Sequence, residues 1–352
     1  MSDIDPATES QTSDSIGALS QVLSGDPMAG LDADMKHVLD TMSELGARPL
    51  EFSSPRGARS QPQASDAVNA IYRRQRRGLA DDGVETEDIA IGDGDDALPA
   101  RLYRPMGLLS RLNPMLLYFH GGGFVTGDLD SHDDSARALA RRSGAIVLSV
   151  AYRLAPEHPF PAAHDDALTA WRFLLAQAHT LGGDPRRLAV AGEDAGANLA
   201  AHVALEARTA YGPNPVHQLL IHPIAGTDMT TPSYGEMLRA QPIGLPAMRW
   251  RFRQLADDKA DLNDPRIDLV QRDDLSGAAP ATILLAGIDP LRSEGEALAE
   301  ALDSAGVPVK CWTYPGVTQG FFGLGLLVTK ALFAQGDAAD ALGKAFTPGR
   351  RS

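Results

Sequence analysis

The chain has 352 residues, of which 43% are hydrophobic and 22% are charged, as expected for a globular protein with a sizeable core. Its 46 acidic and 32 basic residues leave a net charge of -14, which argues against binding to nucleic acid or to an anionic lipid surface. One cysteine, Cys311, excludes an internal disulfide framework, and we expect it to be a small strand residue. No apolar run approaches the roughly 18 residues of a membrane helix, and no signal peptide is visible, so we expect a cytoplasmic protein.

The first 80 residues contain predicted helices but no predicted strand. Residues 1–26 are acidic and rich in Ser, Thr and Gln, which predicts a disordered tail. Apolar residues at helical spacing predict helices over Leu31–Leu45 and Ala64–Leu79. Two helices ahead of any strand predict a cap over residues 27–80.

From residue 81 to about 350, strands alternate with helices, which predicts an α/β domain. Val84–Ile91 and Leu98–Tyr103 alternate like antiparallel strands around a turn. Short apolar runs predict further strands over Met115–Phe119, Ala145–Val150, Leu188–Ala191, Leu219–Ile221, Thr282–Leu285 and Val307–Tyr314. Helices are predicted over Ser131–Arg142, Ala162–His179, Ala195–Thr209, Glu294–Ala305 and Leu327–Phe346. This order indicates a parallel sheet with both faces covered, and residues of about 226–265 interrupt it as a cap insertion.

A glycine-rich loop follows one predicted strand directly. It reads His120-Gly121-Gly122-Gly123 after Met115–Phe119. Consecutive glycines let backbone N–H groups approach a ligand closely. In this position of an α/β sheet, such a loop forms one wall of an oxyanion hole.

Two further segments bear acidic or amide side chains at the ends of strands. Gly192-Glu193-Asp194-Ala195-Gly196 is predicted to be a strand, a sharp turn and a helix, and its small residues suit a nucleophile elbow. Asp289 follows the strand Thr282–Ala286, and Gln319 comes thirty residues later. These positions give the chain order nucleophile, acid and base.

With these motifs the chain resembles the hormone-sensitive-lipase family of α/β hydrolases, the bacterial family IV esterases. The resemblance runs from about Leu31 to Phe346 and includes the segments Gly127–Asp133 and Tyr152–Ala163. It implies an α/β-hydrolase fold: an eight-stranded, mostly parallel sheet with helices on both faces, an N-terminal helical cap and a pocket for acyl esters. A homodimer is an expectation from the family alone.

The chain departs from the family pattern at two of the three triad positions. The resemblance places Asp194 where the family has its nucleophilic serine, and Gln319 where it has the catalytic histidine. Asp289 matches the family's acid. Gln319 cannot exchange a proton near neutral pH, and an aspartate that attacked an ester would form a mixed anhydride.

The leading hypothesis is a non-hydrolytic enzyme of lyase, dehydratase or isomerase type that acts on a small carbonyl or ester-like molecule. The wider group that the chain resembles includes dehydratases, which motivates this hypothesis. Asp194 would act as acid or base, with Asp289 and Gln319 orienting it. Gly121, Gly122 and Ala195 would supply the oxyanion donors.

Two alternatives remain open. In the first, Asp194 occupies the oxyanion hole itself and Gln319 bridges it to Asp289, which would give an inert, ligand-binding protein. The second is a weak carboxylic-ester hydrolase that uses water or a recruited histidine. His164 and His222 could serve only if they reach the pocket.

The remaining polar and aromatic candidates have weaker support. His120, Gly123, Phe124 and Phe321 are expected to contribute to ligand binding, with Phe124, Phe321 and Trp250 forming pocket wall or core. His158 is expected to order a loop, and Asp165 and Asp166 to lie on a solvated helix face. No residue spacing suggests a metal, and no cofactor is expected. The expected partner is a small molecule.

Overall fold

One eight-stranded sheet organises the described part of the chain. The computed structural model describes residues 25–75, 83–94, 97–108, 112–208, 213–256, 258 and 261–347. Its strands are β1 (Val84–Ile91), β2 (Leu98–Pro105), β3 (Asn113–Phe119), β4 (Ile146–Val150), β5 (Gly183–Glu193), β6 (Gln218–Ile221), β7 (Ala281–Ile288) and β8 (Val309–Thr318). They lie in the order β1-β2-β4-β3-β5-β6-β7-β8. Strand β2 is antiparallel to both of its neighbours, and the pairs from β4 to β8 are parallel.

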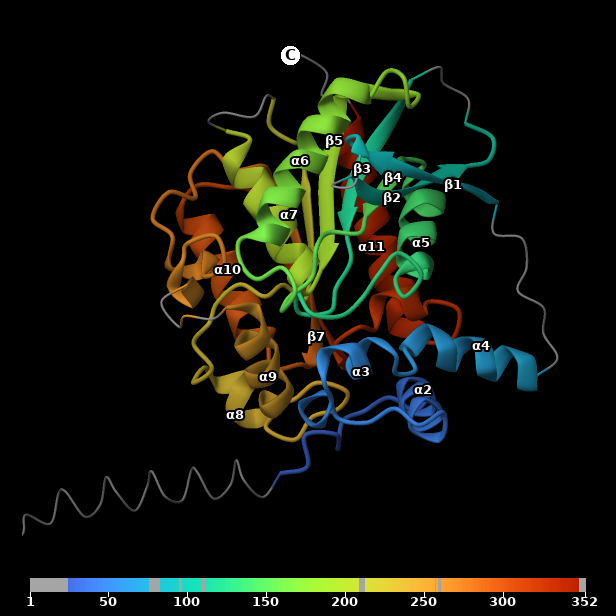
Figure 1. Ribbon diagram of the computed structural model, residues 1–352, viewed down its shortest axis with the longest axis vertical. Helices are drawn as coiled ribbons and strands as arrows, with labels where there is room; N and C mark the ends of the chain where they lie inside the picture. Colours follow the sequence, from blue (N-terminus) through green and yellow to red (C-terminus); the bar gives the residue numbers. More distant parts are fainter. Residues whose placement is uncertain are drawn as a thin grey trace, which may run out of the picture.

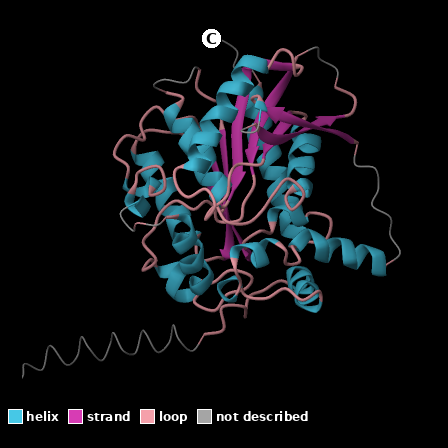
Figure 2. Ribbon diagram, in the orientation of Figure 1, coloured by secondary structure: helices cyan, strands magenta, loops and turns pink. Residues whose placement is uncertain are grey.

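Helices pack on both faces of this sheet (Figures 1 and 2). One face carries α5 (Asp133–Ser143) and α11 (Thr329–Phe346), and the other carries α6 (Ala162–Gln177), α7 (Ala195–Glu206) and α10 (Arg292–Ser304). The central strands β3, β4 and β6 are buried at every residue except Pro114, as apolar runs covered on both sides require. The α/β-hydrolase fold implied by the family resemblance is therefore confirmed.

The other helices gather at one end of the sheet, where the parallel strands have their carboxyl ends (Figure 1). They are α2 (Ala33–Glu44), α3 (Pro55–Arg59), α4 (Ala64–Arg74), α8 (Pro232–Glu236) and α9 (Leu245–Leu255). The first three precede the sheet in sequence, and the last two belong to the interruption at 226–265. Both segments thus lie over the edge at which the sequence motifs converge.

The observed elements differ from the predicted ones mainly at their ends. Strand β5 begins at Gly183 rather than Leu188, and β8 continues to Thr318 rather than Tyr314 because Thr318 pairs with Ile288 after a register shift. The short helices α3 and α8 were not predicted. The predicted tail over 1–26 and the end of the helix predicted to reach Leu79 fall largely outside the described residues.

The expectation of a solvated face at Asp165 and Asp166 is wrong for the second residue. Asp165 is exposed, but Asp166 is buried. Its carboxylate accepts hydrogen bonds from the backbone N–H of Arg153 at 2.8 Å and from the Arg153 guanidinium at 2.6 Å. This pair ties α6 to the loop after β4. Cys311 lies in β8, as expected, and is exposed.

Candidate active site

The turn between β5 and α7 consists of one residue, Asp194, whose backbone is strained. Its φ of 55° and ψ of -116° are unusual for a residue other than glycine. A Cβ on Gly192 would lie 2.1 Å from the Gly196 carbonyl oxygen, and one on Gly196 would lie 2.0 Å from the Phe119 carbonyl oxygen. The two glycines therefore permit the sharp turn that presents Asp194 at the sheet edge. We call residues 192–196 the elbow.

The Asp194 carboxylate is buried among four hydrogen-bond donors. Its Oδ2 accepts from the backbone N–H groups of Gly122 at 2.9 Å and Gly123 at 2.8 Å. Its Oδ1 accepts from Gln319 Nε2 at 3.2 Å. Arg251 Nη1 lies 3.2 Å from Oδ2 and 3.4 Å from Oδ1. Asp194 therefore occupies the place where an oxyanion would be held.

The predicted donors Gly121 and Ala195 do not contact the Asp194 carboxylate. The Gly121 N–H donates to His132 Nε2 at 3.1 Å, and the backbone then reverses at Gly122, whose φ is 117°. This reversal turns Gly123 toward Asp194 in place of Gly121. Ala195 begins α7 and gives the carboxylate no hydrogen bond among the described residues.

Gln319 donates a hydrogen bond to Asp194 but makes none to Asp289, so it does not form the expected bridge between the two carboxylates. Asp289 is fully buried, and its Oδ1 accepts from the Leu291 N–H at 2.9 Å. Its Oδ2 has no hydrogen-bond partner among the described residues. Burial raises the pKa of Asp289 to about 7. Gln319 instead accepts a hydrogen bond at 3.3 Å from Arg251 Nη1.

Arg251 is the site residue that sequence reasoning missed. It comes from α9, and only 6% of its side chain is exposed. A Cβ on Gly123 would lie 2.3 Å from Arg251 Cδ, so the glycine at this position makes room for the arginine stem. The local sequence offers little signal, because Arg251 lies between aromatic residues far from every motif.

His222 reaches the site and His164 does not. His222 follows β6 and lines the pocket, with its Nε2 3.6 Å from Glu193 Oε2 and 3.3 Å from the Gly320 N–H. His164 lies in the core, where its Nε2 is 2.9 Å from Asn198 Oδ1.

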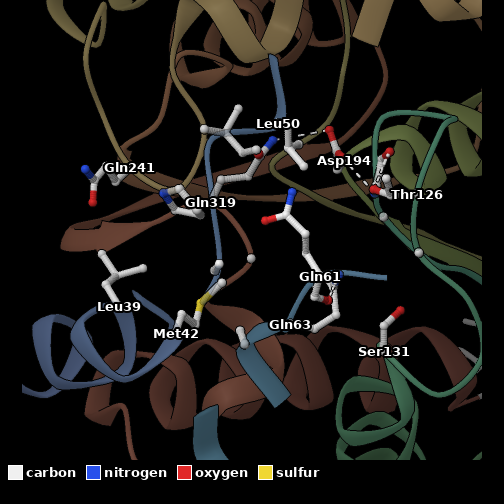
Figure 3. A pocket seen from close by; sticks show the side chains of 18 of the residues that line it. Leu39, Met42, Leu50, Gln61, Gln63, Thr126, Ser131, Asp194, Gln241 and Gln319 are labelled. Carbon is white, nitrogen blue, oxygen red and sulfur yellow. Dashed lines mark hydrogen bonds between the residues drawn. The ribbon is translucent and has the colours of Figure 1, made fainter. Parts of the chain in front are cut away.

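A cavity of about 520 Å³ opens above these residues. Figure 3 shows Asp194 and Gln319 close together on one side, with Leu39 and Met42 of α2 across the cavity. Its floor includes Gly121, Gly122, Asp194, His222, Arg251 and Gln319. Its apolar walls include Met35, Leu39, Met42, Leu50, Leu238, Ile243 and Pro246. The lining also includes charged and polar side chains, namely Arg48, Glu51, Gln61, Gln63, Asp134 and Arg239.

The four predicted binding residues do not line this cavity. His120 stacks on Tyr152 with 4.3 Å between the ring centroids, and this contact holds the start of the glycine loop in place. Phe124 stacks on His164, and Phe321 lies beside Tyr314. Gly123 reaches Asp194 through its backbone only. Trp250 is buried and donates from Nε1 to the Ser53 carbonyl at 3.1 Å.

The described residues contain no group of three or more His, Cys, Asp or Glu side chains that could hold a metal ion. None of the described helices is long and apolar enough to cross a membrane.

Comparison with known proteins assigns the family. A family model described as alpha/beta hydrolase fold matches residues 116–323, which is more than half of the chain. The chain belongs to this family. It is 40% identical over 292 residues to an ethyl acetate hydrolase of Pseudomonas putida, covering 80% of this chain and 88% of the relative. It is also 40% identical over 268 residues to the carboxylesterase NlhH of Mycobacterium tuberculosis, covering 74% of this chain and 82% of that protein.

Solved structures support the same assignment. A thermostable esterase from Pseudomonas putida superposes with a TM-score of 0.82 at 29% identity, covering 92% of this chain and 99% of the other. The relatives at about 40% identity are thus named for ester hydrolysis. They overturn the leading expectation of a lyase, dehydratase or isomerase, and equally the alternative of a binding protein without catalysis. That expectation takes Asp194 and Gln319, which the family resemblance places at the serine and histidine positions, as evidence against hydrolysis, and the reaction class of these relatives points the other way.

Proposed function

We propose that the chain hydrolyses carboxylic esters, with Asp194 in place of the family's nucleophilic serine and Gln319 in place of its histidine. One observation carries the proposal. The N–H groups of Gly122 and Gly123 converge on a single oxygen atom at the elbow, on the floor of the cavity. Two backbone donors at this turn are what the tetrahedral intermediate of acyl transfer requires. Asp194 Oδ2 holds both donors here, so the ester oxygen takes them only when the Asp194 carboxylate is displaced. The named esterases at 40% identity support the same reaction class.

Water is the attacking group in this proposal. Both oxygens of Asp194 already accept hydrogen bonds, so attack by the carboxylate would break several contacts and produce a mixed anhydride. Gln319 cannot take a proton from an attacking group. A water molecule forms no anhydride. It adds to the ester carbonyl carbon, and the tetrahedral intermediate then releases the alcohol and leaves the carboxylic acid.

Arg251 is the cation at this site and offsets the negative charge that forms on the ester carbonyl oxygen. Its Nη1 group is shared between Asp194 and Gln319, and its side chain lines the cavity. A guanidinium has five N–H groups, so donors remain for a substrate oxygen. The surrounding low dielectric strengthens this interaction relative to water.

Hydrolysis of p-nitrophenyl acetate by four purified forms tests the proposal: the unchanged chain, Asp194→Ser, Gln319→His and the double variant. We expect slow turnover by the unchanged chain. We expect the double variant to be faster by about 10²–10⁴-fold, the usual contribution of general acid–base catalysis. Each single variant should gain little, because a serine needs its base and a histidine needs its nucleophile.

A phosphonate that reacts with catalytic serines supplies the control. It should block the double variant and leave the unchanged chain untouched, whereas a contaminating serine esterase would be blocked in every sample. Turnover by the unchanged chain no faster than the buffer rate would disprove the proposed hydrolysis. Turnover equal to that of the double variant would disprove the proposed loss of the triad.

A further inference from the structure

Arg59, the last residue of α3, joins this helix to two loops at the edge of the sheet. Its Nε donates to the Val125 carbonyl at 2.8 Å, and its Nη2 donates to the Ala155 carbonyl at 2.7 Å. The Glu157 carboxylate accepts from both outer nitrogens, at 2.9 Å from Nη1 and 2.6 Å from Nη2. Four of the five N–H groups of the guanidinium are therefore engaged, and they connect α3 to the loop after β3 and the loop after β4.

The Val125 carbonyl belongs to the turn that presents the two donors of the proposed oxyanion site. We call residues 122–126 the donor turn. Three successive residues of this turn have a positive φ, namely Gly122, Gly123 and Phe124. For Phe124 the φ is 66°, in a region that residues other than glycine rarely adopt. Such a backbone persists only where the surrounding contacts hold it.

One internal and two external contacts hold the donor turn. Within the turn, the Gly122 carbonyl accepts from the Val125 N–H at 3.1 Å. From outside, the Phe124 carbonyl accepts from the Ala155 N–H at 2.8 Å, and the Val125 carbonyl accepts from Arg59. Because Arg59 also binds the Ala155 carbonyl, both external contacts depend on its guanidinium.

The ion pair of Arg59 and Glu157 fixes position more than it adds stability. The two side chains are 29% and 53% exposed, and exposed ion pairs contribute little to the free energy of unfolding. The hydrogen bond from Arg59 lowers the pKa of Glu157 to about 2, so the pair stays charged at neutral pH. Ala58, the neighbour of Arg59, is fully buried and lines the cavity. The contacts that fix the donor turn therefore also fix α3 beside the cavity.

We infer that Arg59 is a positioning residue for the two oxyanion donors. By holding the donor turn, it directs the N–H groups of Gly122 and Gly123 to a single point and makes their alignment depend on the place of α3. The inference rests on the proposed ester hydrolysis, in which these donors take the carbonyl oxygen of the ester. A small displacement of the donors lowers the rate, because they act on charge that develops in the transition state.

Amide hydrogen exchange tests this geometry without any turnover. In Arg59→Gln, peptides that span residues 119–126 should exchange at least about tenfold faster than in the unchanged chain, because losing hydrogen bonds from a charged group eases local opening of the turn. Arg59→Lys keeps the charge, but one ammonium cannot bind both carbonyls and the carboxylate in the same geometry, so it should also exchange faster. It replaces Arg59→Gln if that variant does not fold.

Arg208→Gln is the matched control, with Arg208→Lys as its counterpart for the lysine variant. Arg208 follows α7 and likewise donates to two carbonyls, those of Leu205 at 2.7 Å and Ser276 at 2.6 Å. It also donates to the Asp274 carboxylate at 3.2 Å. Its partners all lie outside the donor turn, so exchange at residues 119–126 should stay as in the unchanged chain.

The kinetics of p-nitrophenyl acetate hydrolysis test the consequence for the reaction. In the unchanged chain the donors also hold the Asp194 carboxylate, so their displacement would alter two contacts at once. The double variant Asp194→Ser, Gln319→His has no carboxylate at the elbow and gives the cleaner readout. There we expect Arg59→Gln to lower kcat about 10–10²-fold with little change in KM. Arg208→Gln in the same background should retain both constants.

The outcomes separate this inference from the proposed function. Unchanged exchange at residues 119–126 in Arg59→Gln, or an unchanged kcat, would overturn the inference alone. A rise in KM without a loss of kcat would do the same, because it would show that Arg59 acts on substrate binding. Absence of turnover in the unchanged chain would overturn the proposed function instead. If the double variant does not turn over the ester, the exchange comparison decides the role of Arg59.

Discussion

At the residue scale, Asp194 is a buried charge neutralised by a residue from a distant segment. Arg251 and Asp194 are 6% and 3% exposed at their side chains. Removing one member of a buried ion pair leaves the other uncompensated and is strongly destabilising. The pair therefore explains how the elbow tolerates a carboxylate at all.

Arg251→Met should lower the free energy of unfolding by about 3–5 kcal/mol, because it leaves the Asp194 carboxylate buried without its cation. The same change in an Asp194→Asn background should be much less harmful. Urea unfolding of the four proteins measures the coupling. Additive effects of the two substitutions would show that the pair contributes nothing specific to stability.

The sequence motifs located Asp194, Gln319 and Asp289, because each lies in a short glycine-containing segment after a predicted strand. They could not locate Arg251 or His222. Arg251 enters through helix packing in the least regular segment, and His222 has no motif around it. Likewise, the sequence could not show that Gly123 rather than Gly121 donates a hydrogen bond to Asp194. That choice depends on a backbone reversal at Gly122, which a glycine permits but does not require.

At the element scale, the junction between β5 and α7 depends on backbone contact closer than any side chain allows. Gly196 lies in the first turn of α7, against the last residue of β3. We expect Gly196→Ala to lower the free energy of unfolding by about 1–3 kcal/mol, since the clash is with backbone that cannot easily move. Thermal or urea unfolding provides the measurement.

Gly336 is a helical glycine with open space around it. It lies inside α11, and a Cβ built on it meets nothing within 4 Å. Gly336→Ala should therefore stabilise the protein by about 0.4–1 kcal/mol through lower backbone entropy in the unfolded chain. If Gly196→Ala and Gly336→Ala change the free energy of unfolding in the same direction, the close contact of Gly196 with Phe119 does not determine the effect of Gly196→Ala.

Most of the strands and helices were predictable, and their ends were not. The central strand runs are apolar on both faces, so composition alone reveals them. Where β8 ends depends on its pairing with β7 across a register shift, which is a tertiary property. The short helices α3 and α8 contain five residues each, too few for a periodic signal.

At the scale of the whole molecule, several buried histidines link stability to pH. Burial lowers the pKa of His120, His164 and His217 to about 4 each, and it also lowers the pKa of His132 and His202. Unfolding therefore takes up protons once the pH falls below about 6.5. Four groups with raised pKa values oppose this trend, but they are fewer than the five histidines: His222, Asp268, Asp289 and Glu294. The free energy of unfolding should decrease from pH 6.5 toward pH 4.

His217→Gln removes one of these titrating groups, so the contribution of His217 to the pH dependence can be measured. In this variant the slope of unfolding free energy against pH should become shallower between pH 6 and pH 4.5, by up to about 1.4 kcal/mol per pH unit. Urea unfolding at several pH values gives the slope. An identical slope in the variant and the unchanged chain would show that His217 titrates alike in both states.

Most apolar residues of the cavity wall come from before the sheet and from the interruption at 226–265, whereas Asp194, His222 and Gln319 follow strands of the sheet itself. Under the proposed function, the residues that would select a substrate and the residues that would react with it thus lie in separate stretches of the sequence. Insertions or exchanges within the first 75 residues would then alter which molecules enter the cavity and leave the reacting groups in place. Arg251 is the exception, since it belongs to the wall segment yet contacts Asp194, so recombination at that segment would change the reaction as well as its substrate.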